Sequence, residues 1–169
     1  MSNMSFDDVL LVPQYSDIES RKSLSTSNEL GDTTTLQLPI ISSPMDTVTE
    51  VDMTFAMDAH GGLGIIHRYN SPAEQAQLVR RANLHGLTNV GASIGVTGDF
   101  LERAQALVEE GVNVLCVDVA HGHHSMMKAA LGKLKEVFGD SIHLMAGNVA
   151  TGEGARDLAN WGADSVRVG

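Results

Sequence analysis

The sequence predicts an α/β fold with a parallel sheet, namely the first six strands of a (β/α)8 TIM barrel, which is an incomplete barrel. Three observations indicate this fold. Short apolar runs alternate with segments of amphipathic helical pattern along the chain. The apolar runs lack strict polar alternation, as expected of strands that are covered on both faces. The repeat of about 25 residues fits a barrel of about 250 residues.

The predicted strands are apolar runs rich in Val, Ile and Leu at residues 38–42, 63–67, 89–94, 112–117, 142–146 and 165–168. A closed barrel requires two more strand–helix units than these. A doubly wound open sheet is the structural alternative. No linker, charge block or low-complexity tract divides the chain, so we assign residues 1–169 to one part of a single barrel domain.

The segments between the strands carry helix start and stop signals. Residues 71–74 form a Ser-Pro-Ala-Glu capping box, which predicts a helix to about Arg81. Residues 125–138 are helical by composition, with Leu131, Leu134 and Val137 on one stripe. Three further helices have a candidate capping side chain and a glycine to end them: Thr49 with Gly61, Asp99 with Gly111, and Thr151 with Gly162.

The composition limits the classes of partner. The formal net charge is −10 and the pI is near 4.9, which disfavours nucleic acid as a partner. A small phosphorylated ligand is compatible with this negative charge, because helix N-termini bind phosphate without basic side chains. No apolar run reaches the ~18 residues of a membrane helix, and residues 1–8 lack a signal-peptide pattern. With a single cysteine no internal disulfide can form, and we expect a cytoplasmic protein with no membrane partner.

Polar or small residues follow each predicted strand, where a parallel barrel carries its active site. Small residues let a ligand approach the backbone, although turns favour the same residues for local reasons. Asp118 is the sharpest candidate, because a carboxylate there can accept a hydrogen bond from a ribose hydroxyl or a carboxamide. A helix cap or a loop carboxylate is the alternative interpretation of Asp118.

Two other patterns invite a cofactor. His121, His123 and His124 beside Asp118 would suit zinc, but we favour a polar loop without metal. The glycine cluster at 61–64 follows a helix and opens a strand, which is the reverse of a dinucleotide fingerprint. A helix stop therefore explains these glycines better.

The sulfur-containing residues are mostly expected in the core. Cys116 sits inside an apolar run, where a thiol behaves as a small, unreactive hydrophobe. Most of the eight methionines fall on helical stripes, such as Met53 and Met57 with Ala56. Met45 is the exception, since it lies beyond a strand end, where a soft thioether can rest on a flat ring.

Seven segments, in order along nearly the whole chain, resemble the IMP dehydrogenase and GMP reductase family. They are SFDDVLLVP at 5–13, SSPMDTVTE at 42–50, GGLGIIH at 61–67, GASIG at 91–95, DVAHGH at 118–123, AGNVAT at 146–151 and GADSVRVG at 162–169. The resemblance implies a (β/α)8 barrel enzyme, usually a homo-tetramer. Its dehydrogenase members oxidise IMP to XMP with NAD⁺ through a covalent intermediate on a cysteine.

The resemblance also implies roles for residues of this chain. The purine nucleotide would contact Ser43, Met45 and Asn148, and the NAD side would be lined by Asp118, Val119 and Ala120. The nucleophilic cysteine and the carbonyl ligands of a monovalent cation, K⁺, would lie beyond Gly169. We therefore expect no catalytic residue and no metal ligand within the chain.

The chain departs from the dehydrogenase pattern in three respects. The regulatory pair of cystathionine-β-synthase (CBS) modules is absent, because the second helix runs through residues 83–86 straight into the third strand. Residues 118–120 resemble GMP reductase, whereas residues 121–123 resemble IMP dehydrogenase. The opening motif and the first loop favour the dehydrogenase. GMP reductase, which converts GMP to IMP with NADPH, is the alternative.

The third departure is the end of the sequence at Gly169, before the cysteine loop. We therefore expect the N-terminal portion of an enzyme that needs a complementary C-terminal half of the barrel as its partner. Six strands would leave two open sheet edges until that half is supplied. A non-catalytic fragment or binding module is the competing interpretation.

Overall fold

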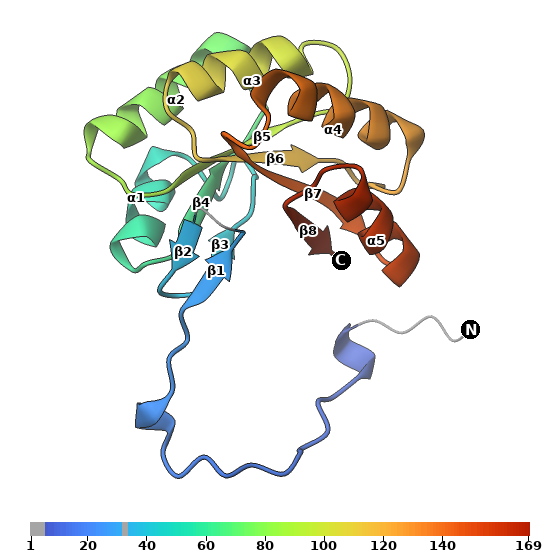
Figure 1. Cartoon of the computed structure of the whole chain (residues 1–169). Coiled ribbons are helices and arrows are strands. Elements are labelled where there is room, and N and C mark those ends of the chain that lie inside the picture. The colour runs from blue at the N-terminus through green and yellow to red at the C-terminus, as the bar shows by residue number, and fades with distance from the viewer. Residues whose placement is uncertain (1–5, 32–33) are drawn as a thin grey trace.

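The computed structural model describes residues 6–31 and 34–169 and shows a six-stranded parallel sheet curled into a half-barrel (Figure 1). The strands are β3 (Ile41–Ser42), β4 (Leu63–Ile66), β5 (Val90–Ile94), β6 (Val114–Asp118), β7 (His143–Val149) and β8 (Ser165–Val168). Each strand pairs in parallel with the next one along the chain. The predicted incomplete barrel is therefore confirmed, and the doubly wound alternative is wrong because such a sheet reverses its strand order.

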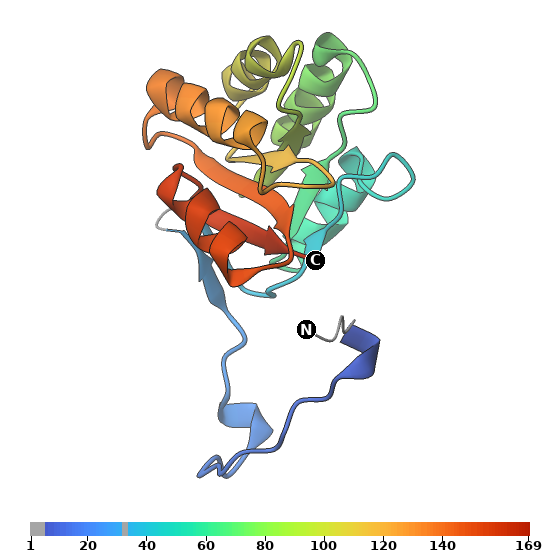
Figure 2. The same ribbon diagram turned by 90° about the vertical axis from the view of Figure 1, so that its right-hand side faces the viewer.

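The α-helices of the described residues lie on the convex side of the sheet, so that the strands form the inner wall (Figures 1 and 2). They are α1 (Val51–Ala59), α2 (Pro72–Leu84), α3 (Phe100–Glu109), α4 (Ser125–Phe138) and α5 (Gly152–Asn160). The capping box at Ser71 is present in full, and the Thr151 side chain accepts from the Gly154 N–H. The predicted bounds of α4 are confirmed, and α2 continues three residues beyond Arg81.

One predicted cap is wrong, and a second lies where it was predicted but makes no side-chain capping bond. The N-cap of α1 is Glu50, and the Thr49 hydroxyl points backward to bond Ser43 instead. Asp99 is the N-cap of α3, but its carboxylate accepts from Arg103 at 3.0 Å and caps no amide. A charge-assisted bond to a buried guanidinium is stronger than one to a terminal amide, which explains the second difference.

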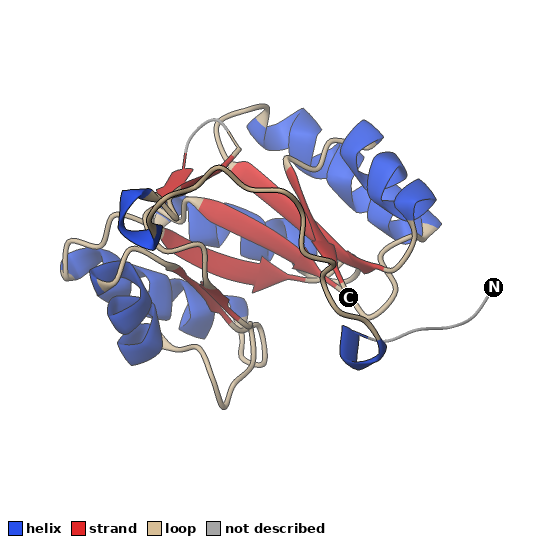
Figure 3. Cartoon of the chain, turned by 90° about the horizontal axis from the view of Figure 1, so that it is seen from below, coloured by secondary structure: helices blue, strands red, loops and turns tan. Residues whose placement is uncertain are grey.

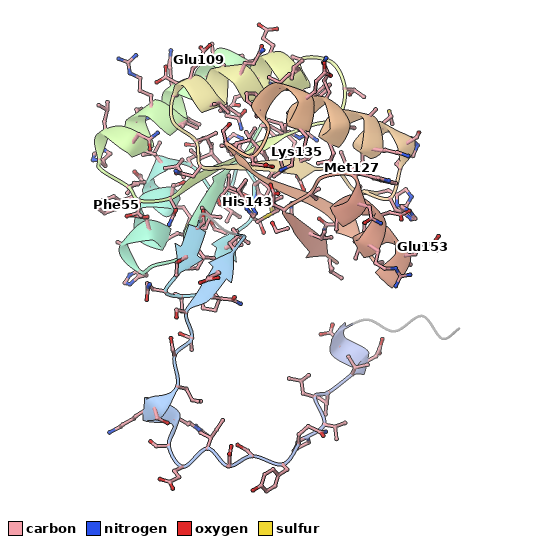
Figure 4. The ribbon with its side chains drawn as sticks, viewed as in Figure 1. Phe55, Glu109, Met127, Lys135, His143 and Glu153 are labelled. Atoms are coloured by element: carbon pink, nitrogen blue, oxygen red, sulfur yellow. The ribbon has the colours of Figure 1, made fainter. Side chains whose placement is uncertain are left out.

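Alternate strand residues feed two separate cores. The larger core lies between sheet and helices and includes Ile66, Ile94, Leu115 and Leu144 from the strands. Met127 of α4 packs there, whereas Glu109 and Glu153 lie on the outer surface (Figure 4). The smaller core lies on the concave face and consists of Leu36, Leu63, Ile65, Val114, Cys116 and Met145. The period of two in a strand sends successive side chains to opposite layers.

The expectation that helical methionines fill the core is only half right. Met127 is buried, but Met53 and Met126 are exposed, as is Val137 of the predicted α4 stripe. The buried Met145 lies on β7 and not on a helix. In α1 the contact with the sheet is made by Thr54 over Gly64, where an added Cβ would come within 2.6 Å of the Thr54 Cα. This close approach leaves the other side of the short helix, including Phe55, outside (Figure 4).

An antiparallel hairpin that the sequence did not suggest packs at the N-terminal ends of the strands. Its strands are β1 (Asn28–Leu30) and β2 (Thr34–Leu36), and Leu36 enters the concave core. Gly31 has φ +63° and lies against His143 at the start of β7, so a side chain there would clash. Figure 3 shows the strands of the sheet in red with the helices in blue outside them. The first predicted strand is shorter than expected, since Pro39 has no N–H to donate to a ladder.

The described residues that precede the hairpin extend away from the body of the molecule (Figure 1). They include two short 3₁₀ turns, η1 (Phe6–Asp8) and η2 (Arg21–Ser23), and the nearly fully exposed Leu10 and Leu11. Among the residues that the structure describes, no helix has the length and apolar character needed to cross a membrane.

Candidate functional site

The C-terminal ends of the six parallel strands bring the predicted site residues to one rim of the half-barrel. Ser43 follows β3, Asp118 ends β6, and Asn148 lies near the end of β7. Because all six strands run the same way, these ends share one edge. These strand-end positions therefore share one rim of the sheet, and their role as a site stays a prediction.

An ion pair between Asp118 and Arg167 crosses the concave face at this rim. The register places Asp118 opposite Gly147 and Gly147 opposite Arg167, so the two charged side chains point inward from β6 and β8. Nη1 of Arg167 donates to Oδ1 of Asp118 and also lies 3.5 Å from the Cys116 sulfur. Both charged side chains are about three-quarters buried.

Arg167 is a site residue that our sequence reasoning missed. Burial disfavours its charge, but the nearby Cys116 and Asp118 outweigh this and raise the pKa of Arg167. The guanidinium therefore stays cationic beside the carboxylate. A signal existed in the sequence: Ser165 and Arg167 alternate with Val166 and Val168, which places the polar pair on the inner face.

A second guanidinium reaches the same point. Nη2 of Arg68, which follows β4, donates to the main-chain oxygen of Asp118 at 3.3 Å. Its Nε is buried and has no hydrogen-bond partner among the described residues. Two arginines thus converge on the end of β6 in a chain whose formal net charge is −10. This rim is locally favourable for a ligand that carries negative charge.

The loop that carries Val119 and Ala120 is joined to the end of β7 by backbone hydrogen bonds. Val119 N–H donates to Gly147 O, Asn148 N–H donates to Val119 O, and Gly122 N–H donates to Asn148 O, at 3.0, 2.9 and 2.7 Å. Val119 is half-buried and Ala120 is exposed. The backbone of this loop is therefore held against that of Asn148, while the Val119 side chain packs against the larger core.

The histidines of this loop have separate local partners. His123 Nε2 lies 2.9 Å from Asp157 Oδ2, and His124 caps α4 by accepting from Met126 N–H. His121 is exposed and lies edge-on to His124. Within residues 6–31 and 34–169, no group of three or more His, Cys, Asp or Glu side chains converges as a metal site.

The loop after β3 presents the predicted nucleotide contacts. Ser43 is exposed, and the Met45 side chain is half exposed next to the buried Pro44. A cavity of about 180 Å³ on the concave side is lined by ten residues, among them Ser43, Met145 and Arg167. The structure therefore brings Ser43 and Arg167 to one cavity, which Asn148 does not line. Asn148 lies beside Gly169, and its Oδ1 is buried without a partner among the described residues.

Cys116 is fully buried below this rim. Burial, aided by the charge of Asp118 and opposed by Arg167, raises the pKa of the Cys116 thiol to about 11. The thiol is therefore neutral at physiological pH, and its side chain belongs to the concave core. Its predicted core position is confirmed.

Comparison with known proteins gives the family. The protein-family model described as "IMP dehydrogenase / GMP reductase domain" matches residues 3–169, nearly the whole chain. The chain belongs to this family. The half-barrel described above is thus the fold of a chain from the IMP dehydrogenase / GMP reductase family.

Relatives with both names are found within this family. The chain is 28% identical to the inosine-5'-monophosphate dehydrogenase of Nitrosopumilus maritimus over 289 residues, with 98% of this chain and 60% of the relative covered. It is 33% identical to that of Cryptosporidium parvum over 208 residues, with 98% and 51% covered. It is also 33% identical to the GMP reductase of Paracidovorax citrulli over 171 residues, with 100% and 51% covered. The chain spans about half the length of these relatives.

Proposed function

We propose that this IMP dehydrogenase / GMP reductase chain supplies the nucleotide- and NAD-binding rim of a barrel that oxidises IMP to XMP. The observation that carries the proposal is the convergence of Asp118, Arg167 and Asn148 at one rim of a domain whose family is oxidoreductase. Residues outside positions 1–169 would complete the reaction, and the complementary C-terminal half of the barrel would be the partner.

For the purine nucleotide we propose contacts with Ser43, Met45 and Asn148. Support comes from the exposed Ser43 and Met45 and from the unpaired Oδ1 of Asn148, since an unpaired buried acceptor calls for a donor. An amide or hydroxyl of the ligand would supply that donor. The half-exposed thioether of Met45 suits the flat face of a purine ring.

For NAD⁺ we propose contacts with Asp118, Val119 and Ala120. The carboxylate of Asp118 is fixed through Oδ1 by Arg167, and no hydrogen bond within the described residues uses Oδ2. That oxygen suits a ribose hydroxyl or a carboxamide N–H. The bound nicotinamide would accept a hydride, and the role of these residues is to hold it in place.

The nucleophile of the proposed reaction is not within this chain. Cys116 is its single cysteine, and it is buried and protonated. The covalent step, the K⁺ ligands and the homo-tetramer stay predictions that concern the larger assembly. We expect the 169-residue chain alone to produce no NADH from IMP and NAD⁺, as followed at the absorbance of NADH.

GMP reductase is the second candidate because of one observation. The alignment with the reductase extends over 171 residues, almost the length of this chain, whereas the dehydrogenase alignments extend over 208 and 289 residues. The two dehydrogenases therefore carry internal residues that this chain lacks. The reductase aligns with this chain almost without such insertions. A reductase would take GMP and NADPH and release ammonia.

Calorimetric titration of the chain with four ligands tests these proposals. Binding of IMP and NAD⁺ in preference to GMP and NADPH supports the dehydrogenase, and the opposite preference supports the reductase. Binding of none would favour a non-catalytic role for the isolated chain. A second arm adds the polypeptide that carries the cysteine loop, from the same genome, and measures NADH formation from IMP or NADPH consumption with GMP.

A further inference from the structure

Thr49 closes the loop that carries Ser43 and Met45. Its side chain is fully buried, and its hydroxyl donates to the main-chain oxygen of Ser43 at 2.6 Å. The same hydroxyl lies 2.9 Å from the Ser42 hydroxyl at the end of β3. One side chain therefore joins the last residue of the strand to the first residue of the loop.

The backbone of Thr49 closes the same loop a second time. Thr49 N–H and Val48 N–H both donate to Met45 O at 2.9 Å, and Met45 N–H donates to Ser43 O at 2.8 Å. The Ser43 carbonyl thus accepts from both the Met45 amide and the Thr49 hydroxyl. The positions of Ser43 and Met45 are set together by these bonds.

This closed loop is also tied to the neighbouring strand. His67, which follows β4, donates its backbone N–H to Thr49 O at 3.4 Å. Its ring Nε2 lies 3.1 Å from a carboxylate oxygen of Glu50, and its Nδ1 accepts from the Tyr69 N–H. Since Nδ1 accepts, Nε2 carries the proton toward Glu50. The loop is therefore anchored at Thr49 and Glu50 and presents Ser43 and Met45 outward.

We infer that Thr49 is a positioning residue for the purine nucleotide. Its hydroxyl holds the Ser43 carbonyl and the Met45 backbone in the arrangement that receives the base, and it does not touch the ligand itself. This inference rests on the proposed function, because it names the residue that sets the affinity of the proposed nucleotide contacts. It also corrects the helix-capping role that the sequence suggested for Thr49.

Three variants separate this role from general stability. Thr49→Val removes the hydroxyl with little change in shape, and Thr49→Ser keeps the hydroxyl. Thr54→Val is the matched control, since Thr54 is also fully buried and its hydroxyl also donates to a backbone oxygen, that of Glu50 at 2.9 Å. That bond lies within the first turn of α1 and holds no part of the Ser43–Met45 loop.

The first measurement uses no nucleotide and reads the loop directly. In ¹⁵N spectra of the intact chain, Thr49→Val should speed hydrogen exchange of the backbone amides at positions 48 and 49 about tenfold, because one loop-closing bond is lost. Thr49→Ser should restore slow exchange, and Thr54→Val should leave these amides unchanged. Unchanged exchange in Thr49→Val would overturn the inference, whatever the ligand results.

The second measurement titrates each variant with IMP and with NAD⁺. Thr49→Val should weaken IMP about tenfold and leave NAD⁺ within about twofold, while Thr49→Ser and Thr54→Val keep both affinities. Faster exchange with an unchanged IMP affinity would also overturn the inference. If the unaltered chain binds no IMP while Thr49→Val still loosens the loop, the proposed function has failed and the loop-closing role has not.

Discussion

Arg167 reaches Asp118 across a single glycine. Gly147 stands between them in the register, and a Cβ built on it would come within 2.6 Å of the Arg167 main-chain oxygen and 2.7 Å of the Arg167 Cβ. The ion pair on the concave face therefore depends on the absence of a side chain at position 147. Two backbones approach there as closely as only glycine allows.

Gly147→Ala should accordingly lower the free energy of unfolding by about 1–3 kcal/mol, the usual cost of overpacking. Gly132→Ala is the control, because Gly132 lies within α4 and an added Cβ would meet nothing within 4 Å. That change should stabilise by about 0.5–1 kcal/mol. Urea unfolding followed by circular dichroism measures both. An equal response of the two variants would contradict the close approach at β7–β8.

Asp118→Asn should weaken NAD⁺ binding about tenfold and leave IMP within about twofold, because it removes the carboxylate that we propose for the NAD side. Calorimetry with each ligand measures this split. Glu136→Gln is the control, since Glu136 forms an exposed pair with Lys133 on α4 and should change neither affinity. If the NAD⁺ affinity of Asp118→Asn stays unchanged, Asp118 is only the partner of Arg167.

Arg103→Met should destabilise the chain by about 3 kcal/mol, as expected when one partner of a buried charged network is removed. Arg103 is 6% exposed and donates to Gln75 Oε1, Asn70 O and the Asp99 carboxylate, at 2.8, 2.9 and 3.0 Å. The buried Gln75 in turn donates to Ser93 O at the end of β5. This network joins α2 and α3 to the rim loops.

Arg80→Met is the matched control for Arg103. Arg80 lies on α2, its side chain is 67% exposed, and its contact with Glu110 is 4.0 Å long. Such an exposed pair adds little stability, so Arg80→Met should change the free energy of unfolding by less than about 0.5 kcal/mol. Thermal or urea unfolding measures this change. If Arg103→Met and Arg80→Met lose similar amounts of unfolding free energy, the buried network adds no stability of its own.

His143 makes the stability depend on pH on the acidic side of neutrality. Burial, with a smaller effect of Lys135 and against the pull of Asp164, lowers the pKa of His143 below 6.5 (Figure 4 shows His143 and Lys135). As the pH falls below 6.5, the unfolded chain takes up the proton first. The contribution of His143 is therefore complete above pH 6.5 and is lost as the pH falls toward the folded-state pKa.

His143→Gln should flatten this part of the stability profile relative to the unaltered chain. Ser165→Ala is the control, because it removes the partner of His143 Nε2 at 2.8 Å but keeps the buried imidazole, so the slope should persist. Urea midpoints between about pH 5 and 7.5 measure the difference. A His143→Gln profile parallel to that of the unaltered chain would mean that His143 titrates alike in both states.

The strands and helices were readable from the sequence because their signals are local. The Ser71 and Thr151 caps, the continuous apolar runs and the alternation of elements fix each unit within about 25 residues. Parallel order then places Ser43, Asp118 and Asn148 at one rim without any knowledge of distances. The sequence by itself thus determined the fold class, the family and the placement of these three residues at the strand-end rim.

Only the tertiary structure decided which side chains meet at that rim. Arg167 and Asp118 are 49 residues apart, and their contact requires the register of β6, β7 and β8 and the curvature of the sheet. The Thr49 side chain could have bonded the free amides at the start of α1 or the Ser43 carbonyl. In the folded chain it donates to the carbonyl. The hairpin β1–β2 is held in place by the packing of Leu36 into the concave core. No local sequence pattern encodes this long-range contact. Local propensity sets the elements, whereas packing between distant segments selects among the polar partners that each side chain could take.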